Sequence, residues 1–267
     1  QQSPFNLLFL HINDIHHNNM SNIVIKRVEN KKDLRTFIDF HYDLYAGNAY
    51  DVPNLYSDEF NTLSRDRNAA FDFCEAEYYL AYRAGRLVGR VAAIINHRAN
   101  ERWDRQDVRF GWIDFVDDIE VTRALLQAVE DYGREKGMKS IVGPLGFTDM
   151  DPEGMLTMGF DKLGTMPTIY NYPYYPEHME RLEGWSKDND YVEYFLEVPD
   201  QIPEKYSKIA QMIEKRYNLH VRKLTRKDIF KGGYGRKLFE LVNETYKDLY
   251  GFSELTDRQI EQYIKMY

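Results

Sequence analysis

The sequence has a single cysteine and no excess of positive charge. Because Cys74 is the only thiol among 267 residues, no disulfide can form within the chain. Lys and Arg number 35 against 43 Asp and Glu, which gives a formal net charge of -8. A chain of this charge has no global positive field to attract nucleic acid or an anionic bilayer. We therefore expect a cytoplasmic protein that has neither nucleic acid nor membrane among its partners.

Patterns of metal ligands are also absent from the sequence. No Cys and His spacing is typical of a zinc site. Asp149, Asp151 and Glu153 alternate in "TDMDPEG", but an EF-hand loop needs further ligands at fixed spacing. The segment is more typical of a turn and a helix cap, although Asp149 stays a candidate for accepting a proton from an amine. We predict no metal site.

The amino-terminal segment lacks the features of a targeting signal. "QQSPFNLLFLHINDIHHNN" has a short apolar run, with no basic residue before it and no small-residue cleavage site. The run is too short to span a bilayer. Regular patterning begins only after Met20. We expect residues 1–19 to be an extraneous or disordered leader.

From Ile23 onward, strand and helix periodicities alternate. "IVIKRVE" alternates like a strand, and "KKDLRTFIDFHYDLY" has apolar residues at helical spacing. A second short helix, a hairpin centred on "RAGR" and the strand "VRFGWIDFV" follow. "IEVTRALLQAVEDYGREKG" predicts a long helix that ends at a glycine, and "MKSIVGPLG" predicts a buried strand. The helix "PEHMERLEG", the strand "YVEYFLEVP" and a linking helix complete the pattern.

A weak internal repeat indicates two related units. "IVIKRVENKKDLRTFIDFHYDLYAGN" is echoed by "HVRKLTRKDIFKGGYGRKLFELVNETYKDLYGF", and both predict strand, polar turn and helix before Asp-Leu-Tyr. We predict one domain over residues 20–198. Residues 199–267 are expected to hold the linking helix and an incomplete second unit.

The order of these elements resembles the Gcn5-related N-acetyltransferase (GNAT) superfamily. "TIYNYPYYPEHMERLEGW" and "LYGFSELTDRQIEQY" are similar to a bacterial subgroup of two-unit acetyltransferase-like proteins of largely unassigned substrate. The resemblance implies an α/β fold with a mixed sheet. It also implies acyl transfer from acetyl-CoA or another acyl-CoA to a small-molecule or peptide amine. The alternative is a non-catalytic, degenerate GNAT module that binds a ligand or packs on a partner domain.

In that superfamily the pantetheine arm lies along the strand that matches "GWIDFV", and the pyrophosphate lies at the next helix N-terminus. The cofactor candidates that this implies are Phe115, Val116, Ile119, Glu120, Val121 and Gly143. Asp117 and Asp118 stand where amides and a cation are needed, and the glycines of the superfamily pattern are missing. We predict that one of these aspartates caps its own helix. The residues that bind the cofactor are then expected in a second GNAT-like unit of a longer chain.

The proton donor is not where the superfamily places it. The matching position, four residues before Gly184-Trp185, is Glu180. Tyr174 and Tyr175 are substitute candidates, and no acid or base is assigned. The tyrosine-rich segment "TIYNYPYYP" predicts either a substrate pocket or an aromatic packing corner. Its pocket candidates are Tyr170, Asn171, Tyr172 and Tyr174.

Overall fold

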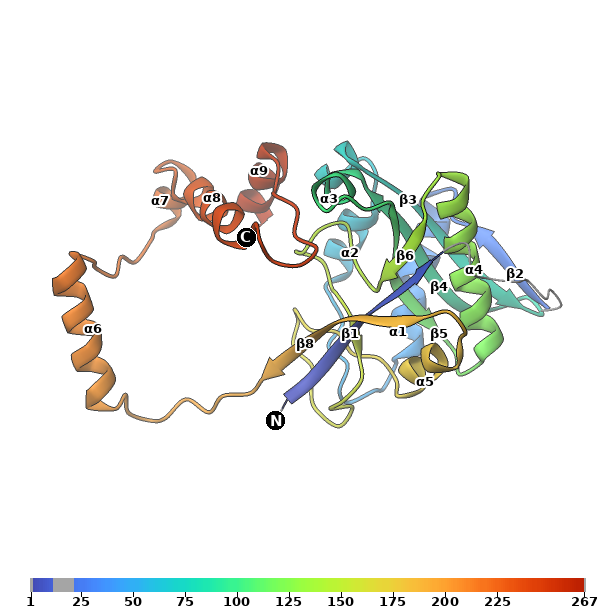
Figure 1. Cartoon of the computed structure of the whole chain (residues 1–267), viewed down its shortest axis with the longest axis horizontal. Coiled ribbons are helices and arrows are strands. Elements are labelled where there is room, and N and C mark those ends of the chain that lie inside the picture. Colours follow the sequence, from blue (N-terminus) through green and yellow to red (C-terminus); the bar gives the residue numbers. More distant parts are fainter. Residues whose placement is uncertain (1, 12–21, 267) are drawn as a thin grey trace. The chain divides into compact units, whose positions relative to one another are not determined.

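The computed structural model describes residues 2–11 and 22–266, which form two compact units (Figure 1). The main unit comprises residues 2–193 and 247–254, and the carboxy-terminal unit comprises residues 194–246 and 255–266. All of the candidate site residues that the sequence provides lie in the main unit.

The main unit is built on a mixed β-sheet. Among the described residues, the strand order is β2-β3-β4-β5-β6-β1-β7, and β8 pairs with β1. The β5–β6 pair is parallel, and the β2–β3, β3–β4 and β4–β5 pairs are antiparallel. The strands are β1 (Gln2–His11), β2 (Ile23–Arg27), β3 (Cys74–Arg83), β4 (Arg86–Asn96), β5 (Asp107–Phe115), β6 (Ser140–Gly143), β7 (Met155–Leu156) and β8 (Ser186–Tyr194). This topology confirms the predicted α/β fold with a mixed sheet.

Helices cover both faces of the sheet (Figure 1). They are α1 (Lys31–Leu44), α2 (Tyr56–Leu63), α3 (His97–Arg102), α4 (Ile119–Glu135) and α5 (Tyr174–Arg181), with a 3-10 turn at Ala69–Asp72. One buried cluster packs α4 and α5 against the sheet, and a second packs α1 and α2 against it. Cys74 lies in the second cluster, as expected of a small buried hydrophobe, and burial raises the pKa of its thiol to about 12.

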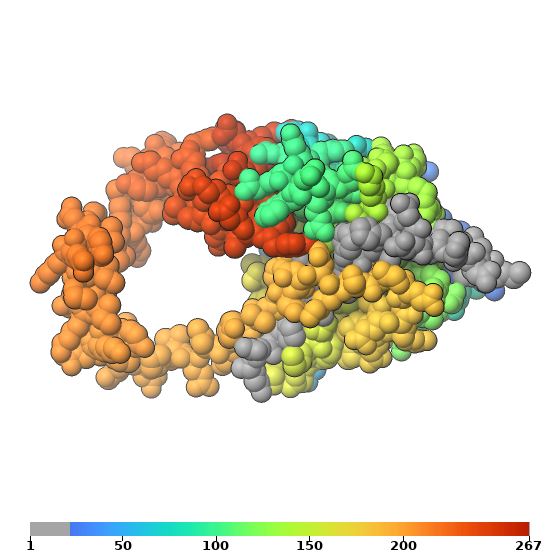
Figure 2. Space-filling model, in the orientation of Figure 1, coloured from blue at the N-terminus to red at the C-terminus, as the bar shows by residue number. Residues whose placement is uncertain are grey.

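The meander around β4 follows from its turn residues. Ala84 and Gly85, between β3 and β4, both have positive φ, which is the backbone of a tight hairpin turn. This confirms the predicted hairpin. Strand β8 runs along the surface of the main unit, and most of its side chains are exposed (Figure 2).

Strand β5 contains a bulge. Arg90 pairs with Asp114 and Ala92 pairs with Gly111, so two residues of β5 oppose one residue of β4. Trp112, inside the bulge, has φ of 44°. A bulge of this kind shifts the alternation of side chains by one residue.

The bulge decides which side chains reach the α1 and α2 face. Phe110 before it and Phe115 after it both pack in the α4 cluster, although they are an odd number of positions apart and simple alternation would place them on opposite faces. Trp112 packs instead with the α1 and α2 cluster. Asp114 reaches the same face, where it contacts His41 of α1. The bulge therefore turns both side chains toward the α1 and α2 face, whereas unbroken alternation from Phe110 would turn them toward α4.

Strand β1 departs from the expectation that residues 1–19 lie outside the fold. Its backbone pairs antiparallel with β6 from Leu8↔Gly143 to His11↔Ser140. This pairing supplies partners for backbone groups along one edge of β6. Those partners lie far away in the sequence, so local patterning gave no signal for them. Residues 12–19, with His16 and His17, lie outside the described residues, and the boundaries 20–198 and 199–267 remain predictions.

The carboxy-terminal unit contains α6 (Glu204–Tyr217), α7 (Arg226–Phe230), α8 (Tyr234–Tyr246) and α9 (Asp257–Met266). A small core of Phe239, Leu255 and Ile260 joins α8 and α9. Residues 218–225, where the repeat predicted a strand, have no regular structure. A strand needs a hydrogen-bonding neighbour, and the described part of this unit offers none. Within the described residues, no helix is both long and apolar enough to cross a membrane.

Candidate functional site

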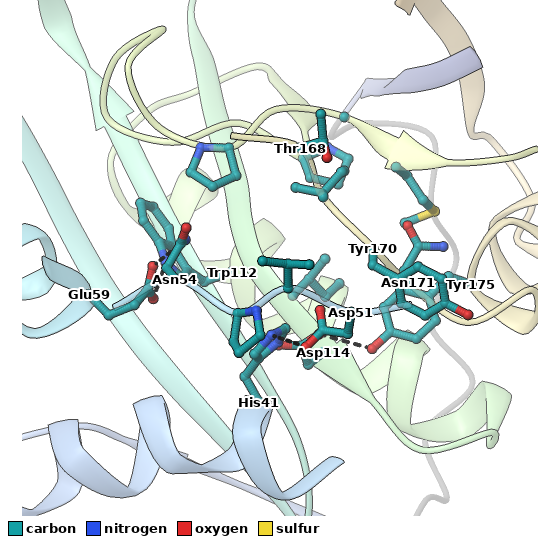
Figure 3. Close-up of a pocket in the computed structure, with 18 of the residues that line it drawn as sticks. His41, Asp51, Asn54, Glu59, Trp112, Asp114, Thr168, Tyr170, Asn171 and Tyr175 are labelled. Atoms are coloured by element: carbon teal, nitrogen blue, oxygen red, sulfur yellow. Dashed lines mark hydrogen bonds and ion pairs between the residues drawn. The ribbon is translucent and has the colours of Figure 1, made fainter. Parts of the chain in front are cut away.

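A pocket of about 110 Å³ lies on the α1 and α2 face of the main unit (Figure 3). Residues of α1, the loop before α2, strands β4 and β5 and the loop from 144 to 171 line it. Its acidic and basic lining residues are His41, Asp51, Glu59, Arg90 and Asp114. Such a concave site with a few convergent polar groups is the usual form of a small-molecule site.

Asp114 contacts both basic side chains of the pocket lining. Its Oδ2 lies 2.7 Å from Nη2 of Arg90 and 3.1 Å from Nδ1 of His41. Its Oδ1 accepts a hydrogen bond of 3.0 Å from the hydroxyl of Tyr175. Nε2 of His41 lies 3.6 Å from Asp51. The two cations and these two carboxylates therefore form one connected network.

The network shifts both of its central pKa values. Burial by itself would raise the pKa of Asp114, but the charges of Arg90 and His41 outweigh it and hold the pKa at about 2. Burial would likewise lower the pKa of His41, but Asp114 and Asp51 outweigh it and raise the pKa to about 9. At neutral pH, His41 is therefore an imidazolium and Asp114 a carboxylate.

The hydroxyl of Tyr175 lies in the pocket lining but is fully engaged. It donates to Asp114, and it accepts from the Tyr45 hydroxyl at 3.0 Å and from the backbone N–H of Phe115 at 3.2 Å. Burial raises the pKa of Tyr175 well above its usual value. As placed, this candidate acid supports Asp114 and does not present a proton to the pocket.

Tyr174 forms a hydrogen bond at the carboxy-terminal end of β5, as Tyr175 does. Its hydroxyl donates to the carbonyl oxygen of Phe115 at 2.7 Å, and the hydroxyl of Tyr175 accepts from the Phe115 N–H. Both main-chain groups of Phe115 are thus bonded to tyrosine side chains at the place where the resemblance puts a pantetheine arm. A pantetheine arm would have to displace both tyrosine hydroxyls to form hydrogen bonds with the main chain there.

The N-terminus of α4 is occupied in a similar way. Asp118 is the N-cap, and its Oδ1 accepts from the backbone N–H of Glu120 at 3.1 Å. Asp118 also forms an ion pair with Arg83. Asp117 lies 3.0 Å from Nε2 of His178 on α5. The predicted cap is confirmed, and the capping carboxylate stands where a pyrophosphate would need free amides.

None of the six cofactor candidates lines the pocket. The backbone N–H of Val116 donates to Val88, and that of Val121 donates to Asp118. Ile119 packs against the α4 cluster. A Cβ on Gly143 would lie 2.3 Å from the Phe110 carbonyl oxygen, so this glycine permits a close approach of β6 to β5. Their role in binding a cofactor remains a prediction.

The tyrosine-rich segment contributes both to the pocket lining and to aromatic packing, and its role in binding a substrate remains a prediction. Tyr170 and Asn171 line the pocket, whereas Tyr172 and Tyr174 do not. The Asn171 side chain bonds the backbone of Leu156 through both its oxygen and its nitrogen, at 2.7 and 3.0 Å. Tyr172 stacks on the ring of Tyr45, with ring centroids 4.9 Å apart.

The acidic segment after β6 forms a turn, with no helix. Thr148 donates its backbone N–H to Asp151 at 3.1 Å. Burial raises the pKa values of these carboxyls, to about 6 for Asp149 and about 7 for Asp151 and Glu153. None of the three lines the pocket. The proton-accepting role of Asp149 has no placement that supports it, and among the described residues no acid, His or Cys group has the geometry of a metal site.

Sequence reasoning missed the charged residues of the pocket. The available signals were Asp114, an acid inside the apolar strand "GWIDFV", and Arg90, a base inside "GRVAAII". Buried charges of opposite sign on neighbouring strands are expected to pair. Nothing in the local pattern linked them to His41 on α1.

Two curated proteins are similar to this chain, and no family model matches it. Protein YghO of Escherichia coli (strain K12) is 30% identical over 177 residues, which covers 66% of this chain and 45% of that protein. Bacterial ceramide synthase of Caulobacter vibrioides (strain NA1000 / CB15N) is 27% identical over 252 residues, which covers 89% of this chain and 61% of that protein. The chain thus spans less than two thirds of the length of either relative.

Solved structures also include partial matches. A GCN5-related N-acetyltransferase from Kribbella flavida has a TM-score of 0.29 at 13% identity, over 52% of this chain and 47% of that one. L-PGS from Bacillus licheniformis has a TM-score of 0.36 at 8% identity, over 55% of this chain and 47% of that one.

Proposed function

We propose that this chain is the acceptor-binding part of an N-acyltransferase, and that another part of a longer protein binds the acyl-CoA. One observation carries the proposal. The main-chain groups that would bind the cofactor, at the end of β5 and at the N-terminus of α4, are already hydrogen-bonded to Tyr174, Tyr175 and Asp118. A charged pocket lies beside the same strand.

The relatives support the direction of this proposal. One relative is named a bacterial ceramide synthase, and a ceramide is by definition an N-acyl amide, so the bond that this relative's name implies joins an acyl group to an amine nitrogen. The pocket of this chain suits an amine, because three carboxyl groups face two basic ones in its lining. An amine arrives as an ammonium ion and is attracted to such a site.

The pKa values assign roles to the groups of the pocket. With its pKa raised to about 9, His41 already carries its proton at neutral pH and does not serve as a base there. With its pKa near 2, Asp114 stays ionised and holds His41 and Arg90 in place. Both residues therefore position the site and set its charge. The proton that the ammonium must lose goes to a group other than these two.

A thiol-release assay tests the proposal. The assay uses a protein of the relatives' length that includes this chain, with long-chain acyl-CoA and primary amines. We expect amine-dependent thiol release that falls at least tenfold in Asp51→Asn, with a larger effect on KM for the amine than on KM for the thioester. Unchanged kinetics in that variant, or release that needs no amine, would refute the assignment of the acceptor site.

The same occupied main-chain groups favour a second candidate function, that of a non-catalytic module that binds a ligand. If the main unit only binds a ligand and takes no part in catalysis, the pocket variant should alter binding of the amine to this chain and leave thiol release unchanged. The two candidates therefore differ in whether turnover responds to Asp51.

A further inference from the structure

Glu59 is a buried carboxylate that lacks a cationic partner. Only 8% of the residue is exposed. Its Oε1 accepts from Nδ2 of Asn54 at 2.9 Å, and its Oε2 accepts from the indole N–H of Trp112 at 2.8 Å (Figure 3). Both donors are neutral. Among the residues that the structure describes, no Lys, Arg or His forms an ion pair with it.

The other acids of the pocket differ in this respect. Asp114 is paired with Arg90 and His41, and Asp51 lies 3.6 Å from His41. Since both basic groups of the lining are committed to these two carboxylates, Glu59 leaves the pocket with one negative charge unbalanced. A buried charge without a partner is costly in free energy, and a bound cation would offset that cost.

We infer that Glu59 is the anchor for a cationic ligand group in this pocket, and that the group is a primary ammonium. The inference rests on the proposed function for the identity of the acceptor. Each carboxylate oxygen already accepts one hydrogen bond, so one lone pair on each remains for a ligand. A small ammonium uses such single positions, whereas a guanidinium forms its strongest pair with a carboxylate whose two oxygens are both free.

A metal ion fits the site less well than an ammonium. Ca²⁺ takes six to eight oxygen ligands and Mg²⁺ demands a near-octahedral set. In the described residues, no group of acids and histidines could hold a metal ion. The groups that reach the Glu59 oxygens are the amide NH2 of Asn54 and the indole N–H of Trp112, which donate hydrogen bonds and offer no lone pair to a metal.

The rest of the lining suits an alkyl amine. Pro53, Ile113 and Met155 supply apolar surface within the same pocket. Trp112 supplies an aromatic ring next to the carboxylate, and a ring near a cation adds attraction of about 0.5–2 kcal/mol. The β5 bulge, where Trp112 has a positive φ, holds that indole toward Glu59. Charge and apolar surface thus lie side by side, as an alkyl ammonium requires.

Calorimetric titration of this chain with n-octylamine and n-octanol at pH 7 tests the inference. The two probes share the alkyl chain, and only the amine carries a charge. We expect the wild type to bind octylamine at least tenfold more tightly than octanol. Glu59→Gln, which keeps the size and an acceptor oxygen, should remove this preference. Asp58→Asn on the same helix removes an equal charge outside the pocket lining and should keep the preference.

A wild type without preference for the amine, or a Glu59→Gln variant that keeps it, would overturn the inference. If Glu59→Gln fails to fold, the wild type still gives a test: octylamine and not octanol should change the fluorescence of Trp112, scored against Trp112→Phe. An absence of that change would also overturn the inference. Loss of the preference in Glu59→Gln without any thiol release from the longer protein would refute the proposed function alone. Thiol release that is indifferent to Glu59→Gln would refute the anchor alone.

Discussion

The imidazole of His41 on α1 lies 3.1 Å from the carboxylate of Asp114 on β5, although the two residues are 73 positions apart in the sequence. The pair joins the helix to the sheet at the floor of the pocket. Because the Asp114 carboxylate is paired with both His41 and Arg90, its charge is compensated within the pocket lining before any ligand binds.

The stabilising effect of His41 should depend on pH. Its pKa in the folded chain, about 9, lies above the usual histidine value of 6.5. Its contribution to the free energy of unfolding is therefore fully present below about pH 6.5 and is lost as pH rises through about 9. Urea unfolding of wild type and His41→Gln should show a large difference at pH 6 and a small one at pH 10. A difference that stays constant over this range would contradict the ion pair.

Asp114→Asn should be strongly destabilising. The substitution leaves Arg90 and His41 buried without their carboxylate, for which we expect a loss of roughly 3–5 kcal/mol in the free energy of unfolding. Asp190→Asn is the control, because Asp190 forms an exposed ion pair with Lys187 and should cost about 1 kcal/mol or less. Equal losses in the two variants would show that the buried network does not hold the floor together.

Loss of the hydroxyl should lower the free energy of unfolding more at Tyr175 than at Tyr174. Tyr175→Phe removes the acceptor of the buried Phe115 N–H and a donor to Asp114, so we expect a loss of about 1–3 kcal/mol. Tyr174→Phe removes one hydrogen bond to a carbonyl at a half-buried position and should cost about 0.5–1.5 kcal/mol. Chemical denaturation measures both. The assignment of these hydroxyls fails if Tyr174→Phe is the more damaging change.

Asp118 should act mainly as a helix cap. Asp118→Ala removes the acceptor for the Glu120 N–H and should lower stability by about 0.5–2 kcal/mol. Asp118→Asn keeps a capping oxygen and loses only the charge toward Arg83, so it should cost less. Thermal unfolding of the two variants compares them, and an equal loss would assign the effect to the ion pair.

The part of the fold that depends on local patterning was predictable. The hairpin at Ala84-Gly85 and the cap at Asp118 each follow from residues within a few positions of each other. Amphipathic spacing likewise located α1 and α4. The elements that failed depend on distant partners. Strand β1 needs the edge of β6, and the segment near His220 lacks a strand beside it in the described residues.

The site was harder to predict than the fold. It depends on a bulge in β5 and on charged residues from α1, β4 and β5 that meet only in the folded chain. Simple alternation along β5 places Asp114 on the face opposite to Gly111 and α1, and the bulge at Trp112 reverses this. The pairing of Asp114 with His41 and Arg90 is tertiary. Tyr170 does line the pocket, and its role toward a substrate remains a prediction, whereas the charged residues of the pocket lie outside the tyrosine-rich segment.

The most direct test of the account is a calorimetric titration of this chain with acetyl-CoA. Tyr174 and Tyr175 are bonded to the carboxy-terminal end of β5, and Asp118 caps α4. We therefore predict no saturable binding with a dissociation constant below about 1 mM. A dissociation constant in the micromolar range would contradict the claim that these elements are closed to the cofactor and that its grip lies elsewhere in the longer protein.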